Sequence, residues 1–364
     1  MGAAPDTPLR FVRRDALLVL AFAGFAVAAV WFVPQVVVIP SEAEPKDVLP
    51  LRLLRSALMF GVPVIVAFAL VRNPVRFAVC LVVLFLAATL NTGPHGETLL
   101  ITRNFFGTLR VTRTPDGTFT RLVHGTTQHG QQRIGSPEPL MYYYRTGPIG
   151  RLLTHLPPEQ RNRVAVVGLG CGAMAAYAQP GQTWTFYEID PGVVRIARDP
   201  AYFTYLRDCR VEPRIVLGDA RRRLEREPDG AFDLIVLDAF SSDAIPVHLL
   251  TQEAFAMYVK KLSPNGVLAF HLSNRYLDLP PLVARLGAAH DPPFATKSDD
   301  DFVTEREKED GKILSQWVVQ YRDATSLGPM VAKDIRWQRQ RLTPGPVWTD
   351  GFSNLLAVWK RDEE

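Results

Sequence analysis

The stretch Val164-Ala-Val-Val-Gly-Leu-Gly-Cys-Gly172 decides the fold, because an apolar strand runs directly into three alternating glycines. Glycines after a strand let the backbone approach a ligand closely, and a following helix presents free N–H groups to it. A second apolar run, Trp184–Tyr187, ends on Glu188, twenty residues after Gly168. An acidic residue at such a strand end accepts hydrogen bonds from both hydroxyls of a ribose. The sequence therefore predicts a nucleoside site on an α/β domain.

Two further strand ends indicate which nucleoside is bound. Gly218-Asp219-Ala220 suits a carboxylate that meets the exocyclic amine of an adenine, and the apolar run Leu234–Leu237 ends on Asp238. Open α/β sheets bind ligands at the carboxyl ends of their strands, so these acids are expected in one site. The segment Gly170–Ala175 also fits the dinucleotide pattern G-x-G-x-x-A. The downstream acids favour an S-adenosylmethionine-type sulfonium over a nicotinamide cofactor.

Strand and helix patterns alternate from Arg163 onward, which is typical of a parallel sheet. Ahead of them, an alternating segment turns at Thr114-Pro-Asp-Gly-Thr118, a strong hairpin signal. We therefore expect a Rossmann-like, S-adenosylmethionine-dependent methyltransferase-type parallel sheet in residues 146–364, preceded by a small antiparallel β-unit in residues 96–145. The charge-dense segment Lys297–Asp310 is predicted to be a mobile surface loop.

Residues 1–95 are predicted to form a membrane anchor of two or three transmembrane helices in contact with lipid. Ala16–Val38 is 23 residues long without a charge, enough to cross a hydrocarbon core of ~30 Å at ~1.5 Å per residue. Two shorter apolar runs follow, Ala57–Val71 and Phe77–Leu90. Buried helices of a soluble fold and a cleaved signal peptide are the alternatives.

Two signals disagree about the side of the membrane on which the nucleoside domain lies. Arg10, Arg13 and Arg14 favour a cytoplasmic N-terminus, and three spans would then place the rest of the chain outside. The cytosolic supply of S-adenosyl donors instead favours the cytoplasmic face for the nucleoside domain, which is the localisation we expect.

Composition excludes several classes of function. The net charge of +4 is small for 364 residues, and the densest basic run, Arg221–Arg223, lies beside acids, so nucleic acid is not an expected partner. Cys80, Cys171 and Cys209 show no paired spacing, so neither a disulfide framework nor a metal site is expected.

The soluble part resembles the spermidine synthase family, specifically its membrane-linked bacterial branch. The motifs that carry this resemblance are Arg103–Gly107, His124–Gly130, Phe186–Pro191, Asp233–Asp243 and Trp348–Leu355. The resemblance covers about Leu99 to Trp359. It implies a polyamine aminopropyltransferase that uses decarboxylated S-adenosylmethionine as co-substrate, acts on an amine and releases methylthioadenosine. It also places Gln128 on the substrate side and implies a possible homodimer.

Three departures from the family keep other activities open, one of which is that Ala-Phe-Ser-Ser separates Asp238 from Asp243 where the two family aspartates lie close together. Cys171 stands where the family carries an Asp that holds the aminopropyl amine, and Pro139–Arg145 replaces an acidic stretch that lines the amine groove. Intact S-adenosylmethionine could therefore be the donor, which would make the protein a methyltransferase. A non-catalytic nucleoside-binding domain that accompanies a membrane partner is a third hypothesis.

The chemistry assigns roles to individual residues. An ammonium with a pKa of ~10.4 must lose a proton before it attacks a sulfonium, and a carboxylate at a strand end suits that task. We expect Asp238 to accept the proton, Asp243 to hold the amine or cap a helix, and Tyr143 to supply a hydroxyl or pack in the core. His248 and His271 lie near strand ends, where they could relay protons or act as structural histidines. The predicted cofactor-binding residues are Gly168, Gly170, Gly172, Glu188, Asp219 and Ala220.

Overall fold

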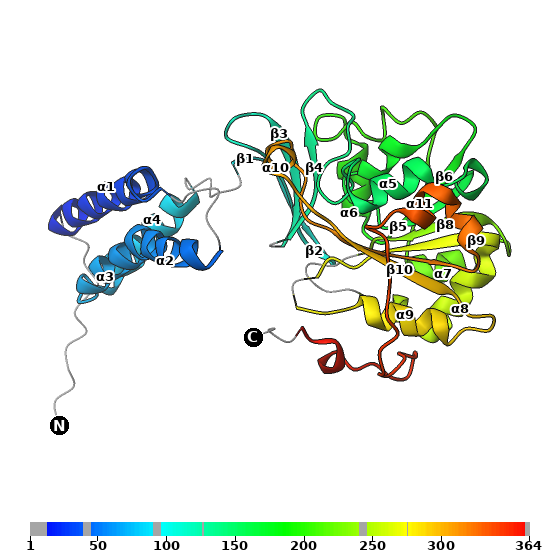
Figure 1. The fold of residues 1–364 in the computed structure, drawn as a ribbon. Coiled ribbons are helices and arrows are strands. Elements are labelled where there is room, and N and C mark those ends of the chain that lie inside the picture. Colours follow the sequence, from blue (N-terminus) through cyan, green and yellow to red (C-terminus); the bar gives the residue numbers. More distant parts are fainter. Residues whose placement is uncertain are drawn as a thin grey trace. The chain divides into compact units, whose positions relative to one another are not determined.

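The computed structural model describes residues 13–38, 45–89, 96–125, 127–239, 246–274 and 276–360 (Figure 1). The chain divides into two compact units, Met1–Pro94 and His95–Glu364. The boundary that we predict at residue 145 stays a prediction.

The first unit is helical. Its elements are α1 (Arg13–Val36), α2 (Pro45–Ser56), a π-helical segment (Ala57–Gly61), α3 (Val62–Ala69) and α4 (Pro74–Thr89). Among the described residues, only α1 is long and apolar enough to cross a membrane, since the apolar helices Leu53–Ala69 and Pro74–Ala88 are shorter. The coarse prediction of an apolar N-terminal helix is confirmed, whereas two or three transmembrane helices stay a prediction.

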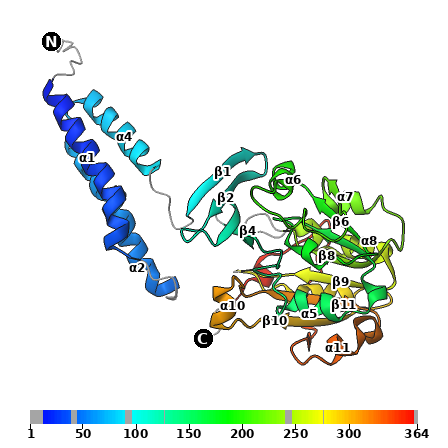
Figure 2. The ribbon, with the colours of Figure 1, turned by 90° about the horizontal axis from the view of Figure 1, so that it is seen from above.

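A polar clamp fixes how α1 and α4 pack. Asp15, buried in the first turn of α1, accepts hydrogen bonds from Arg76 Nη1 at 3.1 Å and from Asn73 Nδ2 at 3.3 Å. Arg76 also donates to the carbonyl oxygen of Leu70 at the end of α3. The clamp brings the start of α1 beside the start of α4, and Figure 2 shows the two helices side by side. Hence α1 and α4 run in the same direction.

The second unit begins with a four-stranded antiparallel sheet of order β1-β2-β3-β4. The strands are β1 (Glu97–Asn104), β2 (Gly107–Arg113), β3 (Phe119–His124) and β4 (Thr127–Arg133). The predicted hairpin joins β2 and β3, where Asp116 accepts hydrogen bonds from the N–H and hydroxyl of Thr118.

The main sheet has eight strands in the order β12-β10-β11-β9-β8-β5-β6-β7. The strands are β5 (Arg163–Val167), β6 (Thr183–Glu188), β7 (Arg214–Leu217), β8 (Phe232–Leu237), β9 (Leu262–His271), β10 (Ala295–Asp300), β11 (Gln316–Tyr321) and β12 (Gln338–Arg339). Strands β5 to β9 are parallel, whereas β11 pairs antiparallel with both β9 and β10, and β12 pairs antiparallel with β10. The predicted α/β fold with a mostly parallel sheet is confirmed.

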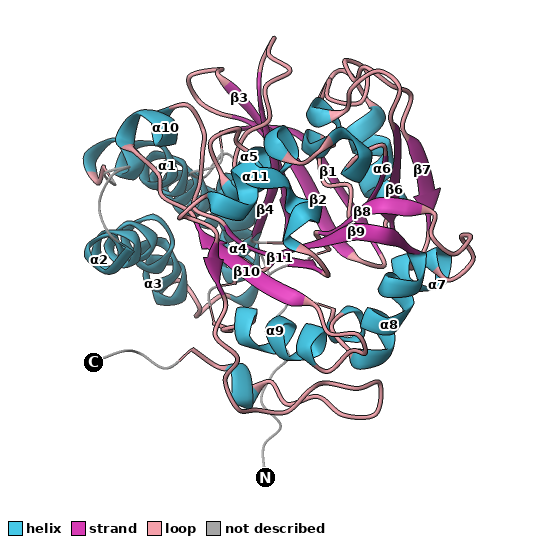
Figure 3. Cartoon of the chain, turned by 45° about the vertical axis from the view of Figure 1, so that its right-hand side comes forward, coloured by secondary structure: helices cyan, strands magenta, loops and turns pink. Residues whose placement is uncertain are grey.

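Helices cover both faces of this sheet (Figure 3). One face packs against α5 (Pro148–His155), α6 (Pro191–Arg198) and α11 (Gly328–Lys333). The other packs against α7 (Ala220–Leu224), α8 (Gln252–Lys261) and α9 (Pro280–Ala288). Because both faces are buried, the central strands read as continuous apolar runs, which is why they stand out in the sequence.

The predicted mobile loop at Lys297–Asp310 is wrong. The segment instead forms most of β10 and the short helix α10 (Glu305–Glu309). Asp299 in β10 is buried, and its charge is paired with that of Arg151 in α5. A charged residue in this segment therefore does not indicate exposure to solvent. Thr304 and Glu307 form a capping box at the start of α10, a T-x-x-E signal that the sequence did carry.

Candidate active site

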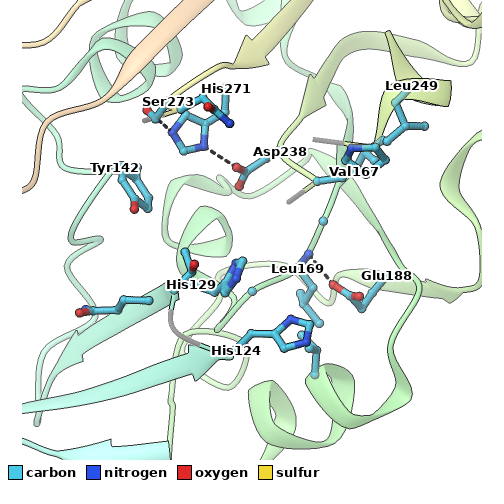
Figure 4. Close-up of a pocket in the computed structure, with 18 of the residues that line it drawn as sticks. His124, His129, Tyr142, Val167, Leu169, Glu188, Asp238, Leu249, His271 and Ser273 are labelled. Carbon is cyan, nitrogen blue, oxygen red and sulfur yellow. Dashed lines mark hydrogen bonds and ion pairs between the residues drawn. The ribbon is translucent and has the colours of Figure 1, made fainter. Parts of the chain in front are cut away.

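A cavity of about 860 Å³ opens at the carboxyl ends of the parallel strands (Figure 4). Val167, the last residue of β5, pairs with Tyr187 of β6 and with Leu237 of β8. Leu237 in turn pairs with Phe270 of β9. The residues that follow these positions therefore lie at one level, where the chain leaves the sheet and lines the cavity.

The glycine loop after β5 is shaped by two glycines that line the cavity. Gly168 has φ +102°, and a Cβ there would lie 2.3 Å from the carbonyl oxygen of Asp238. Gly170 has φ +54°, in the left-handed region that favours glycine. Gly172 does not line the cavity, and a Cβ at this position would contact the side chain of Leu206. Gly168 and Gly170 are thus placed to contact a ligand, and Gly172 to turn the chain.

Glu188 links the end of β6 to the glycine loop. Its Oε2 accepts a hydrogen bond from the N–H of Leu169 at 3.0 Å, and its Oε1 accepts one from the N–H of Asp190 at 2.9 Å. Burial raises the pKa of this carboxyl, and the backbone N–H groups oppose that shift. Contact of Glu188 with the hydroxyls of a ribose stays a prediction.

Asp219 and Ala220 follow β7 and line the cavity. Asp219 Oδ1 caps α7 by accepting a hydrogen bond from the N–H of Arg222 at 2.9 Å. Its Oδ2 lies 3.4 Å from Nε2 of His248, which is half exposed. Contact of Asp219 with an adenine amine stays a prediction.

Asp238, after β8, is the centre of a buried hydrogen-bonded group. Its side chain is 7% exposed, and its Oδ2 accepts a hydrogen bond from the hydroxyl of Tyr143 at 2.6 Å. Burial, together with the negative charge of Asp238, raises the pKa of Tyr143 well above its usual value. Tyr143 is therefore a hydrogen-bond donor to Asp238 and not a base.

The same carboxylate contacts a histidine. Asp238 Oδ1 lies 2.7 Å from Nδ1 of His271, the last residue of β9, whose Nε2 lies 2.7 Å from Oγ of Ser273. Figure 4 shows the three side chains in a row along the cavity wall. Ser273 is a residue that sequence reasoning missed. The His-x-Ser pattern at the end of an apolar strand is the signal that could have found it.

Two other predicted substrate residues have different outcomes. Gln128 of β4 lines the cavity and donates a hydrogen bond to Oε1 of Gln131 at 3.0 Å. Asp243 lies outside the described residues, so its role stays a prediction.

Cys171 points away from the cavity. Its side chain is buried in the core and packs so closely on β4 that a Cβ on Gly130 would lie 2.3 Å from its Sγ. Burial raises the pKa of this thiol to about 12. Position 171 therefore offers no charge to a ligand in the cavity.

The wall of the cavity is rich in acid. Of its described residues, only Lys360 is a lysine or arginine, and its Nζ donates to the carbonyl oxygen of Asn274 at 2.8 Å. Six of them carry a carboxyl group: Glu188, Asp190, Asp219, Asp238, Asp300 and Asp301. Within the described ranges, no three His, Cys, Asp or Glu side chains are grouped to hold a metal ion. On the described wall, carboxyl groups therefore outnumber lysines and arginines.

Two curated proteins match part of this chain in sequence. No family model matches the chain. It is 39% identical over 123 residues to a polyamine aminopropyltransferase of Vibrio vulnificus, a match that covers 32% of this chain and 38% of that protein. It is 33% identical over 118 residues to polyamine aminopropyltransferase 2 of Streptomyces coelicolor, covering 30% and 21% of the two chains. The matches thus span well under half the length of these relatives.

The fold has a relative that covers more of the chain. The crystal structure of a probable spermidine synthase from Corynebacterium glutamicum superposes with a TM-score of 0.52 at 16% identity, covering 72% of this chain and 99% of that one. In local sequence and in overall fold, the chain resembles the spermidine synthase family, as its motifs predict.

Proposed function

We propose that this protein transfers an aminopropyl group from decarboxylated S-adenosylmethionine to a polyamine amine and releases methylthioadenosine. The observation that carries the proposal is the acid-rich cavity at the carboxyl edge of the sheet, with Asp238 at its centre. Both substrates are cations, and a wall of carboxylates attracts cations. The local likeness to polyamine aminopropyltransferases supports the same reaction.

The reaction is a displacement at carbon. The lone pair of the acceptor nitrogen forms a bond to the methylene carbon next to the sulfonium, and the carbon–sulfur bond breaks with its electron pair moving to sulfur. The acceptor ammonium loses one proton before attack. The proposal gives that proton to Asp238, and it is supported by the acceptor position that each oxygen keeps beside its bond to Tyr143 or His271. General-base assistance of this kind contributes typically ~10²–10⁴-fold.

The charge of the cavity favours the decarboxylated donor. Intact S-adenosylmethionine carries a carboxylate that needs a cationic or N–H partner, yet Lys360 is the sole lysine or arginine among the described wall residues. Burying a charge without a partner is costly. The decarboxylated donor presents only positive charge to the same wall.

One observation favours the second candidate, methyl transfer from intact S-adenosylmethionine. Cys171, at the place where the family carries an acid for the aminopropyl amine, faces the core and not the cavity. Binding of a donor that does not need an acid at position 171 would not be weakened by the cysteine there.

Mass spectrometry of the nucleoside product separates these candidates. The full chain in detergent micelles is incubated with either donor and a mixed polyamine pool. Methylthioadenosine together with a polyamine heavier by one aminopropyl unit supports the proposal. S-adenosylhomocysteine from the intact donor would replace it with methyl transfer. Binding of both donors without turnover would leave a non-catalytic nucleoside-binding protein.

The variant Asp238→Asn tests the catalytic assignment. Asparagine keeps the size of the side chain but accepts no proton at neutral pH, so turnover is expected to fall by about 10²-fold or more. Nucleoside affinity, measured by calorimetry, should stay within about twofold of the wild type. Unchanged turnover would contradict the role of Asp238.

We also propose that the helical unit anchors the protein to a membrane as a multi-pass segment. Large apolar side chains of α1, α3 and α4 are exposed, including Leu17, Leu20, Ile65, Phe68 and Phe85. Exposed large apolar side chains of this kind are typical of lipid contact. Because S-adenosyl donors are supplied in the cytosol, we propose that the unit that holds the cavity lies at the cytoplasmic face of the membrane. The homodimer that the resemblance implies can be tested by light scattering.

A further inference from the structure

The end of β9 places an imidazole directly against the proposed base. His271 has a side chain only 3% exposed and lies 2.7 Å from Asp238 Oδ1 through its Nδ1. Its ring stacks on Trp317 of β11, with centroids 4.6 Å apart and an interplanar angle of 12°. The centroid of the imidazole ring also lies 4.8 Å from the centroid of the Tyr142 ring. The imidazole is thus held by packing as well as by hydrogen bonds.

The partners of His271 define where its proton lies. An ionised carboxylate only accepts hydrogen bonds, so Nδ1 carries the proton and donates it to Asp238. With Nδ1 as the donor to Asp238, Nε2 faces the hydroxyl of Ser273 at 2.7 Å. Oγ of Ser273 itself accepts a hydrogen bond from the N–H of Gln316 at 2.9 Å, which leaves its hydroxyl hydrogen for His271. Each link in this row therefore has a donor and an acceptor.

The row is tied to rigid parts of the sheet. Trp317 pairs with His271 in the β9–β11 ladder, and Gln316 is the first residue of β11. Asp238 has Tyr143 on its other oxygen. Two partners, one on each oxygen, fix the rotation of the carboxylate, so its remaining acceptor positions have a defined direction.

We propose that His271 is a positioning residue for the transfer reaction, holding the ionised Asp238 carboxylate in the orientation that receives the amine proton, with Ser273 fixing the imidazole. This inference rests on the proposed function and adds a residue to it. Without the N–H of His271, Asp238 keeps its charge and still attracts the amine, but its orientation is no longer fixed. The loss is therefore expected in kcat and not in KM for the amine.

Two substitutions at one position separate positioning from packing. His271→Asn keeps an N–H donor near the place of Nδ1, whereas His271→Leu keeps apolar volume and removes the donor. Ser273→Ala leaves the histidine but removes its second anchor. His155→Leu is the matched control, because His155 is exposed at the end of α5. Kinetics are measured on the full chain with the donor that the wild type uses.

His271→Leu is expected to lower kcat about tenfold or more, because a hydrogen bond to a charged group is lost, while KM for the amine changes less than about threefold. His271→Asn should recover most of that loss, Ser273→Ala should fall between the two, and His155→Leu should match the wild type. The inference is overturned if Leu and Asn lower kcat equally, if Leu has no effect, or if KM rises instead of kcat falling.

The design keeps this inference distinct from the proposed function. A wild type that turns over neither donor refutes the proposed function, and the positioning role falls with it. An active wild type whose His271→Leu variant is equally active refutes the positioning role alone.

Discussion

Tyr143 is the residue whose hydroxyl most directly shapes the proposed base. It donates to Asp238 at 2.6 Å and keeps its proton, because burial and the nearby carboxylate both raise its pKa. Tyr143→Phe removes one of the two donors that fix Asp238 and is expected to lower kcat about tenfold or more. The measurement is the rate of nucleoside release from the full chain.

The control for this prediction is Tyr202→Phe, since Tyr202 is a partly buried residue packed at the edge of the same core. Equal rates for Tyr143→Phe and the control would show that the hydroxyl at position 143 does nothing for the base.

For single residues, the sequence predicts which positions lie at strand ends better than it predicts which side chains contact one another. Gly168 and Asp238 could be predicted because each directly follows an apolar strand, and Glu188 because it ends one. The partners of Asp238 could not, because Tyr143 lies 95 residues away and His271 33 residues away in the chain. The direction of Cys171 was likewise hidden, since a loop residue faces core or cavity according to the strand packed against it.

Among the elements, strands β10 and β11 contribute residues to the cavity wall. In the order of the sheet, β9 and β8 separate them from β5, which carries the glycine loop. Asp301 there is paired with Lys312 at 3.1 Å, and both side chains are only 2% exposed. Asp300 instead accepts a hydrogen bond from the neutral amide of Gln316 at 2.7 Å. The charge of Asp300 is therefore available to a cation in the cavity.

We predict that Asp300→Asn raises KM for a polyamine about two- to fivefold, the range of an exposed charge pair, and leaves kcat within twofold. KM for an acceptor with a single amine should not change. Asp208→Asn, at an exposed site beside Arg207, is the control. A shift that is equal for both kinds of acceptor would exclude an interaction with the second amine.

The elements that the sequence reveals are those buried on both faces. The parallel strands are continuous apolar runs, and α6 begins and ends where its pattern does. Strand β10 was hidden, because Asp299 takes a partner 148 residues distant that no local pattern shows.

For the whole molecule, the clamp between Asp15 and Arg76 sets the direction of the chain through the proposed anchor. Because α1 and α4 begin at the same end of the helical unit, the chain enters at one end and leaves at the other. If the unit spans a membrane, the two termini are predicted to lie on opposite sides. Placement of the cavity in the cytoplasm then requires an external N-terminus.

Reporter fusions at each end of the full chain test this topology. One terminus should be accessible only from outside and the other only from inside. Both reporters on one side would show that the chain crosses the membrane an even number of times or not at all, which would contradict the predicted topology.

Carboxyl groups outnumber lysines on the described cavity wall even though Asp301 is paired with Lys312, and this excess has a consequence for the binding of salt ions. Such a wall collects small cations, which a polyamine must displace as it enters. At physiological ionic strength, charges are screened beyond ~8 Å, so the attraction acts near the mouth of the cavity and weakens as salt rises. Acceptors with more amines displace more ions, and their capture should therefore be the most sensitive to salt. The protein would then respond not only to the concentration of its substrates but also to the ionic strength around it.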